Sequence, residues 1–191
     1  MAKKNDKNND ILISIIVPVY NTSKYLVKCL DSIYAAIDND CEVIIVNDGS
    51  TDDSERIIKD YISNLKNETY KNNTVYIYKE NKGLADTKNV GIKKSRGKFI
   101  SVVDSDDRIN KNFYRDAREY LDKNDMVIYD LYTDYEDDPK YNHIIRAARE
   151  DCLDSKVSKF VHGAMQGSSC NKIIKKDFHP KREHEKTKDF Y

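Results

Sequence analysis

Short apolar runs that alternate with segments of helical periodicity constrain the fold of this chain most strongly. The runs are rich in β-branched residues and almost continuously apolar, as expected for parallel strands that are covered on both faces. We predict four such strands, at residues 11–19, 42–47, 74–78 and 98–103. Their alternation with helices predicts an α/β fold with a mostly parallel central sheet and helices on both of its faces.

The segments between these runs carry apolar residues at helical spacing. In the first segment, Leu26, Leu30, Ile33 and Ile37 recur after polar residues that are suited to cap a helix. Further helices are predicted around residues 57–65, 86–95 and 110–123, with a polar loop at 66–73 and a fifth strand at 126–132. The periodic pattern weakens beyond that strand, so no elements are predicted there.

Size and charge exclude several classes of protein. A chain of 191 residues is long enough for one domain with a modest extension. Its 33 basic and 33 acidic side chains give a formal net charge of zero, so it lacks the electrostatic footprint of a nucleic-acid-binding protein. The longest apolar run, residues 11–20, has half of the ~20 residues that cross a bilayer, and no membrane span is expected.

The amino-terminal segment and the cysteines bear on the compartment. Residues 1–10 are charged and polar and lack the apolar core of a signal peptide, so we expect a disordered tail and no export. The cysteines are scattered and form no C-x-x-C pair, which favours reduced thiols over a zinc site or a disulfide framework. A cytoplasmic location is therefore expected.

Polar residues follow each of the four predicted strands. In open α/β sheets, ligands bind in the crevice beyond the carboxyl ends of the strands, so residues at these ends carry more weight than others. We expect the four ends to converge on one site. They occupy residues 18–21, 47–50, 81–83 and 104–107.

Asp104 and Asp106 are the strongest candidates for a metal site. Two carboxylates at alternate positions after a strand offer oxygen ligands to Mg²⁺ or Mn²⁺, and such a cation would bridge a diphosphate. In a chain this rich in aspartate the triplet also arises by chance, and Asp107 is suited to cap a following turn. Its place after an apolar strand, with three other polar strand ends, favours the metal site.

Other polar residues at these strand ends have two interpretations each. Asp48 either belongs to an ordinary Asp-Gly-Ser turn or is a buried acceptor for an N–H group of a nucleobase. Lys88 is either a solvated helix residue or a balance for diphosphate charge. Gly83 and Gly91 suit turn and close-packing positions whatever the function. No dinucleotide fingerprint or P-loop sequence is present.

Five motifs together resemble family 2 glycosyltransferases of the GT-A fold, in both order and spacing. They are VPVYN at 17–21, VNDGSTD at 46–52, NKG at 81–83, KNVG at 88–91 and VDSDD at 103–107. The resemblance implies a GT-A-type, Rossmann-like domain whose nucleotide-sugar-binding half spans residues 11–125. Residues 126–191 would begin an acceptor-side half that is cut short, since family members commonly continue with further helices.

The resemblance also implies a nucleotide-sugar donor, usually a UDP-sugar, and direct displacement with inversion at the anomeric carbon. Asp106 would be the principal ligand of a Mn²⁺ or Mg²⁺ ion, Asp104 would lie near the ribose and the metal, and Asp48 would hold the uracil edge. Lys88 replaces the arginine that is common in the family, and a point charge in place of a bidentate fork would weaken diphosphate binding. The implied nucleotide-sugar-binding residues are Pro18, Tyr20, Asn21, Asp48, Asn81, Gly83, Lys88, Asp104 and Ser105.

Asp189 is the implied catalytic base. In the family the base is an aspartate beyond the D-x-D triplet, after a segment that resembles residues 170–177. Asp189 occupies the corresponding position, although Lys188 stands where an acidic residue is usual. Glu183 and Glu185 are rival candidates, and a solvated aspartate in a charged tail is an equally good interpretation of Asp189.

These features predict a metal-dependent, inverting glycosyltransferase that moves a hexosyl or N-acetylhexosaminyl group from a UDP-sugar to a hydroxyl of a saccharide or lipid-linked acceptor. Family analogy places it in bacterial cell-surface polysaccharide or glycoconjugate synthesis, in the cytoplasm or peripherally at the inner membrane face, with a membrane-associated partner. The alternative is a nucleotide-sugar-binding module that is catalytically incomplete or acts as a partner subunit. Nucleotidyl transfer would need a basic loop after the first strand, which residues 21–24 do not supply.

Overall fold

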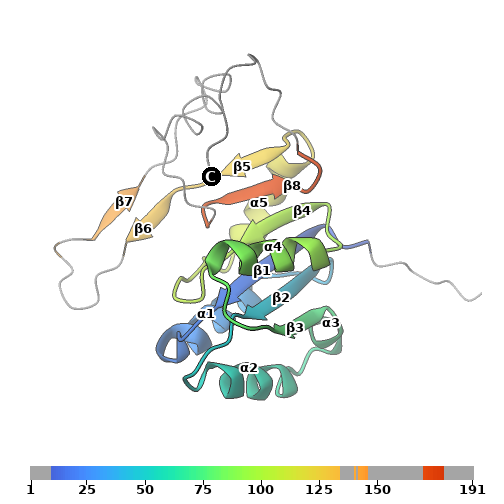
Figure 1. The fold of residues 1–191 in the computed structure, drawn as a ribbon. Helices are drawn as coiled ribbons and strands as arrows, with labels where there is room; N and C mark the ends of the chain where they lie inside the picture. Colours follow the sequence, from blue (N-terminus) through green and yellow to red (C-terminus); the bar gives the residue numbers. More distant parts are fainter. Residues whose placement is uncertain (1–9, 134–139, 141, 146–169, 179–191) are drawn as a thin grey trace, which may run out of the picture.

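A six-stranded sheet forms the centre of the computed structural model, which describes residues 10–133, 140, 142–145 and 170–178 (Figure 1). The strand order is β3-β2-β1-β4-β8-β5. These strands are β1 (Ile13–Val19), β2 (Cys41–Asn47), β3 (Thr74–Tyr78), β4 (Phe99–Val102), β5 (Met126–Ile128) and β8 (Lys172–Lys175). A separate two-stranded sheet pairs β6 (Leu131–Thr133) with β7 (His143–Ile145). The tail expected at the amino terminus lies outside the described residues, apart from Asp10.

The first four strands run parallel to one another, and β8 is antiparallel to both β4 and β5. All seven residues of β1 and all seven of β2 are buried, as the continuous apolar runs predict. The prediction of a mostly parallel α/β sheet is therefore confirmed.

Helices cover both faces of this sheet. They are α1 (Ser23–Ala36), α2 (Ser54–Ser63), α3 (Glu68–Asn72), α4 (Leu84–Lys94) and α5 (Phe113–Leu121). The main core joins Leu30 of α1, Ile58 of α2 and Tyr114 of α5 to one face of the sheet. On the other face, α4 packs against β1 and β2 (Figure 1). Because neighbouring side chains of a strand point to opposite faces, Ile15 faces the main core and Ile16 faces α4.

The structure differs from the sequence prediction at three places. The predicted loop at 66–73 contains the short helix α3, whose first turn is capped by the Asn67 side chain. The single strand predicted at 126–132 is divided between β5 and β6, which belong to different sheets. Strand β8 was not predicted at all. In the described part of the chain, Cys29, Cys41 and Cys170 are free thiols, and no helix is long and apolar enough to cross a bilayer.

Gly91 allows α4 to approach β1 closely. A Cβ atom at this position would lie 2.4 Å from Cγ2 of Ile16. We expect Gly91→Ala to lower the free energy of unfolding by about 1–2 kcal/mol, because overpacking outweighs the better helix propensity of alanine. Urea unfolding measures the change. Ile16→Ala removes the obstructing carbons, so the losses of the two single variants should not add in the double variant; simple additivity would contradict the packing argument.

Candidate active site

The carboxyl ends of the parallel strands open into a pocket of about 460 Å³. Eight of the residues that the sequence singles out line it: Pro18, Tyr20, Asp48, Asn81, Gly83, Asp104, Ser105 and Asp106. The parallel register explains this convergence, because Val19 of β1 pairs with Asn47 of β2, and Asn47 pairs with Tyr78 of β3. The strands therefore end at one level, and the polar residues that follow them meet at the same edge.

Asp48 is buried at the end of β2, where it holds the loop that follows β3. Its Oδ1 accepts a hydrogen bond from the backbone N–H of Lys82 at 3.0 Å, and its Oδ2 accepts one from that of Gly83 at 2.9 Å. The ammonium of Lys79 also donates to Oδ1. Burial alone would raise the pKa of Asp48, but the hydrogen bonds from Lys79 and Lys82 lower it below its ordinary value. Asp48 is thus an ionised acceptor that also anchors a turn.

Asn21 and Lys88 do not line the pocket, although each contacts a segment that does. Asn21 has a φ of 52°, and its Oδ1 accepts hydrogen bonds from the backbone N–H of Thr51 at 2.8 Å and of Asp52 at 3.3 Å. It therefore ties the loop after β1 to the loop after β2. Lys88 is largely buried rather than solvated, and its Nζ lies 3.2 Å from Oδ1 of Asp104.

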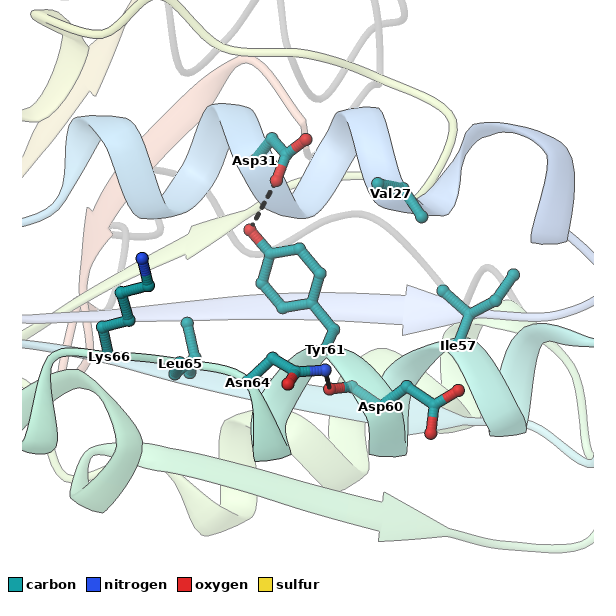
Figure 2. Close-up of a pocket in the computed structure, with 8 residues that line it drawn as sticks. All are labelled: Val27, Asp31, Ile57, Asp60, Tyr61, Asn64, Leu65 and Lys66. Carbon is teal, nitrogen blue, oxygen red and sulfur yellow. Dashed lines mark hydrogen bonds between the residues drawn. The ribbon is translucent and has the colours of Figure 1, made fainter.

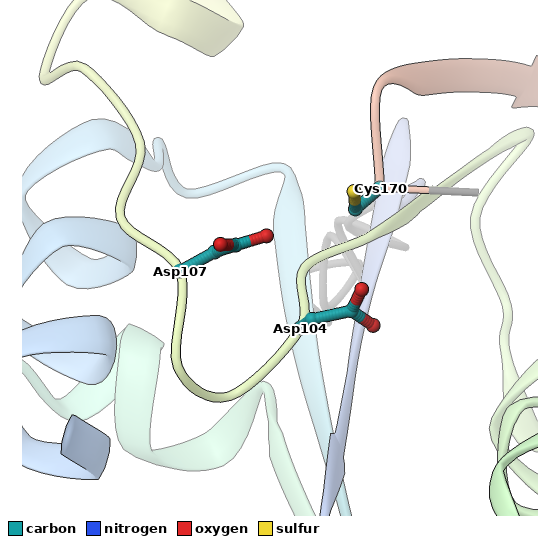
Figure 3. A group of neighbouring side chains, drawn as sticks. All are labelled: Asp104, Asp107 and Cys170. Atoms are coloured by element: carbon teal, nitrogen blue, oxygen red, sulfur yellow. The ribbon is translucent and has the colours of Figure 1, made fainter. Parts of the chain in front are cut away.

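The carboxylates after β4 form a concentration of negative charge. Ligand atoms of Asp104, Asp107 and Cys170 lie within 4.8 Å of one another, where the loop after β4 passes the start of β8 (Figure 3). Partial burial and the charges of Asp106 and Asp104 raise the pKa of Asp107. Oδ1 of Asp104 is buried and paired with the ammonium of Lys88, but it has no hydrogen bond within the described ranges. Asp106 is exposed and lines the pocket beside this group.

Four pocket residues were not predicted from the sequence: Val19, Thr22, Leu84 and Thr87. Thr22 donates a hydrogen bond from Oγ1 to Oγ of Ser105 at 2.9 Å, which links the loop after β1 to the loop after β4. Thr87 is buried in α4 and donates to the carbonyl of Gly83 at 2.8 Å. The sequence signal for these residues was their position beside the polar strand ends, but valine and leucine are apolar, and a threonine hydroxyl does not by itself indicate a ligand site.

The predicted base Asp189 and its rivals Glu183 and Glu185 lie outside the described residues. The segment that precedes them in the resemblance, residues 170–177, forms β8 and the turns at its two ends. Asp189 therefore remains a prediction.

A second hollow, of about 550 Å³, lies between α1 and α2 (Figure 2). Its lining includes Val27, Ile57 and Leu65, and Tyr61 in its wall donates a hydrogen bond to Asp31 at 2.8 Å. Its lining residues belong to α1, to α2 and to the segment directly after α2, and none of them lies at the carboxyl end of a strand. The pocket at the strand ends is consequently the better candidate for catalysis.

Several known proteins are similar to this chain in sequence and in fold. Residues 14–180 match the family model of glycosyl transferase family 2. The putative glycosyltransferase EpsH of Bacillus subtilis is 32% identical over 167 residues, which cover 86% of this chain and 47% of EpsH. The minor teichoic acid biosynthesis protein GgaB of the same organism is 33% identical over 129 residues, which cover 65% of this chain and 14% of GgaB.

Among solved structures, the S. aureus TarS fragment 1–349 in complex with UDP-GlcNAc superimposes with a TM-score of 0.65. It is 25% identical, and the match covers 86% of this chain and 45% of the TarS chain. The chain thus spans less than half the length of each of these proteins.

Proposed function

The chain belongs to glycosyl transferase family 2, and we propose that it binds a nucleotide-sugar and transfers the sugar to an acceptor hydroxyl with inversion. The observation that carries this proposal is the convergence of eight sequence-selected residues, from four strand ends, on one pocket of about 460 Å³. A pocket of this size accommodates a ligand of nucleotide-sugar dimensions. The UDP-GlcNAc complex of TarS supports a UDP-sugar as the donor.

Different pocket residues contact the base, the ribose and the diphosphate of the donor. Pro18 and Tyr20 lie on the side of the nucleoside, and Tyr20 is 48% exposed, so its ring is available for contact with a base. Asp48 accepts a hydrogen bond from an N–H group of the base, whereas Asn81 and Ser105 offer hydrogen-bonding groups to the ribose. Lys88 holds Asp104 and brings a positive charge toward the diphosphate.

The residues after β4 fit a divalent cation. Oδ1 of Asp104 is a buried acceptor that is paired with the Lys88 ammonium at 3.2 Å but has no hydrogen bond among the described residues. Partial burial and the charges of Asp106 and Asp104 raise the pKa of Asp107, and a cation would relieve the part that comes from repulsion. Asp104 and Asp106 would hold Mn²⁺ or Mg²⁺, both of which prefer oxygen ligands. The cation would offset the negative charge that grows on the departing diphosphate.

The transfer itself is a displacement at the anomeric carbon. The acceptor oxygen forms a bond to that carbon as the bond from the carbon to the diphosphate oxygen breaks, and a carboxylate takes the proton of the acceptor hydroxyl. We assign this proton transfer to Asp189, on the family resemblance of the segment that precedes it.

Surface-glycan synthesis is the process that fits this chain best. Its relatives EpsH and GgaB are named as a putative glycosyltransferase and as a teichoic acid biosynthesis protein, respectively. We place the reaction in the cytoplasm, where nucleotide-sugars and the free thiols of Cys29, Cys41 and Cys170 both persist. The acceptor would be a saccharide or a lipid-linked saccharide, presented peripherally at the membrane or by a membrane-associated partner.

A thermal-unfolding experiment tests the donor assignment. The chain is heated with UDP, GDP, CDP or ADP, each with and without Mn²⁺. At about a hundredfold excess over Kd, specific binding adds roughly 2.7 kcal/mol, which raises the Tm of a domain of this size by several degrees. We expect the largest shift for UDP with Mn²⁺. Equal shifts for all four nucleotides would contradict base selection.

The outcome also separates enzyme from binding module. UDP binding accompanied by hydrolysis or transfer of a UDP-sugar supports the glycosyltransferase. UDP binding without either reaction, in the full-length protein, would favour a module that is catalytically incomplete or acts as a partner subunit.

A further inference from the structure

Lys79 follows β3 and contacts Asp48, but it does not itself line the pocket. Its backbone N–H donates to the carbonyl of Asn47 at 3.0 Å, which continues the pairing of β2 with β3 by one residue. This extra ladder bond puts Lys79 beside Asp48. The lysine side chain is only 13% exposed, so its position is defined by packing as well as by charge.

The ammonium of Lys79 is fully engaged by the protein. It donates to Oδ1 of Asp48, contacts Oδ2 of Asp86 at 3.0 Å and donates to the carbonyl of Glu80 at 3.0 Å. A fourth acceptor, Oγ1 of Thr87, lies at 3.4 Å, so the three N–H donors of the ammonium are shared among four protein acceptors. Lys79 therefore has no donor left for a ligand. Of its two partners that line the pocket, Asp48 and Thr87, Asp48 is the closer one, and we expect the main effect of Lys79 on the pocket to pass through it.

The contacts of Lys79 determine how Asp48 faces the pocket. Three N–H groups, from Lys79, Lys82 and Gly83, occupy three of the roughly four lone-pair positions of an ionised carboxylate. Two of them bind Oδ1, so the remaining acceptor capacity lies on Oδ2. A carboxylate in this state accepts a hydrogen bond from a ring N–H, as uracil carries at N3. It has no proton for the bare ring nitrogen that cytosine carries at the same place.

We infer that Lys79 is a positioning residue for base selection: it keeps Asp48 charged and oriented, and so favours nucleotides whose base presents a ring N–H. Asp86 assists by holding the ammonium from the other side. This inference rests on the proposed function, because it requires that Asp48 contacts the base. It assigns Lys79 no direct contact with the donor.

The test compares Lys79→Met with Lys79→Arg by isothermal titration of UDP and of CDP in the presence of Mn²⁺. We expect Lys79→Met to reduce the preference for UDP over CDP about tenfold, the effect of one lost hydrogen bond to a charged acceptor. Lys79→Arg keeps the charge and should retain most of the preference. Lys59→Met removes a lysine that pairs with Glu55 on the surface of α2 and should leave both affinities unchanged.

The pH dependence of UDP binding gives a readout that a purely structural role would not change. Burial raises the pKa of Asp48, but the hydrogen bond and charge of Lys79 lower it below its ordinary value, and Asp86 contacts the same ammonium at 3.0 Å. Without the lysine this pKa rises, so the carboxylate is protonated at a higher pH as acid is added. In Lys79→Met, UDP binding should therefore weaken at a higher pH than in the wild-type chain.

The outcomes separate this inference from the proposed function. An equal loss of UDP and CDP affinity in Lys79→Met, together with an unchanged pH profile, would overturn the positioning role but leave the donor site intact. Failure of the wild-type chain to bind UDP would overturn the proposed function and this inference with it. If Lys79→Met does not fold, Asp86→Asn can be used instead. It weakens the ion pair between Lys79 and the partly exposed Asp86, and it should also reduce the preference for UDP over CDP.

Discussion

Asp104→Asn is expected to lower the affinity for UDP in the presence of Mn²⁺ about a hundredfold, the effect of removing one carboxylate ligand and its charge. Asparagine preserves the size of the side chain, so the loop after β4 should keep its conformation. Two interactions are lost: the cation loses an oxygen ligand with full charge, and Lys88 loses the partner that lies 3.2 Å from its Nζ. Isothermal titration with UDP measures the change.

The metal-free titration gives this prediction its sharpest control. Wild-type affinity should fall when Mn²⁺ is removed, whereas the affinity of Asp104→Asn should be nearly the same with and without the metal. Asp116→Asn changes an exposed aspartate of α5 and should behave as wild type in both conditions. Retention of full Mn²⁺-dependent affinity in Asp104→Asn would remove Asp104 from the metal site.

The strand ends were predictable because two independent patterns coincide there. Continuous β-branched runs locate parallel strands, and the polar residues that follow them must lie at one edge when the strands are parallel. Asp48, Asn81 and Asp104 were placed together on this reasoning alone, and they line one pocket in the structure. Thr22 and Thr87 escaped prediction because a threonine in a loop or helix is ordinary and gains its role only from its neighbours in space.

Contacts between loops were not predictable because they depend on geometry rather than on residue type. Asn21 was expected in the nucleoside pocket, yet its side-chain oxygen binds backbone amides of the loop after β2. Lys79 gave no sequence signal, since a lysine after a half-buried strand is usually solvated. Strand β8 was missed for another reason: it pairs with β4 and β5 across a long stretch of sequence, and local periodicity does not detect such a partner.

Buried polar groups at the two ends of the sheet have different roles, ligand binding at the carboxyl ends and stabilisation at the amino ends. At the carboxyl ends, polar groups keep acceptor capacity for a ligand. At the amino ends, Glu42 of β2 is buried but fully satisfied by protein donors. It accepts hydrogen bonds from Oγ of Ser14 at 2.6 Å and from the backbone N–H and Nε of Arg96 at 2.5 and 2.8 Å. The carboxylate therefore joins β1 and β2 to the turn between α4 and β4.

Glu42→Ala is expected to lower the free energy of unfolding by about 3 kcal/mol, near the lower end for loss of one partner of a buried ion pair. The decrease in the free energy of unfolding is not larger because the Arg96 side chain is 58% exposed and can be solvated when its partner is removed. The hydroxyl of Ser14 is fully buried and cannot, so it loses a hydrogen bond without replacement. Urea unfolding, followed by circular dichroism, measures the difference.

A matched control separates burial from charge in this experiment. Glu55→Ala removes a glutamate of α2 that pairs with Lys59 at the surface, and its unfolding curve should superimpose on that of the wild type. Glu42→Ala should also bind UDP with wild-type affinity while it remains folded, because Glu42 lies at the end of β2 remote from Asp48. Equal urea midpoints for Glu42→Ala and the wild type would show that this buried carboxylate does not stabilise the sheet.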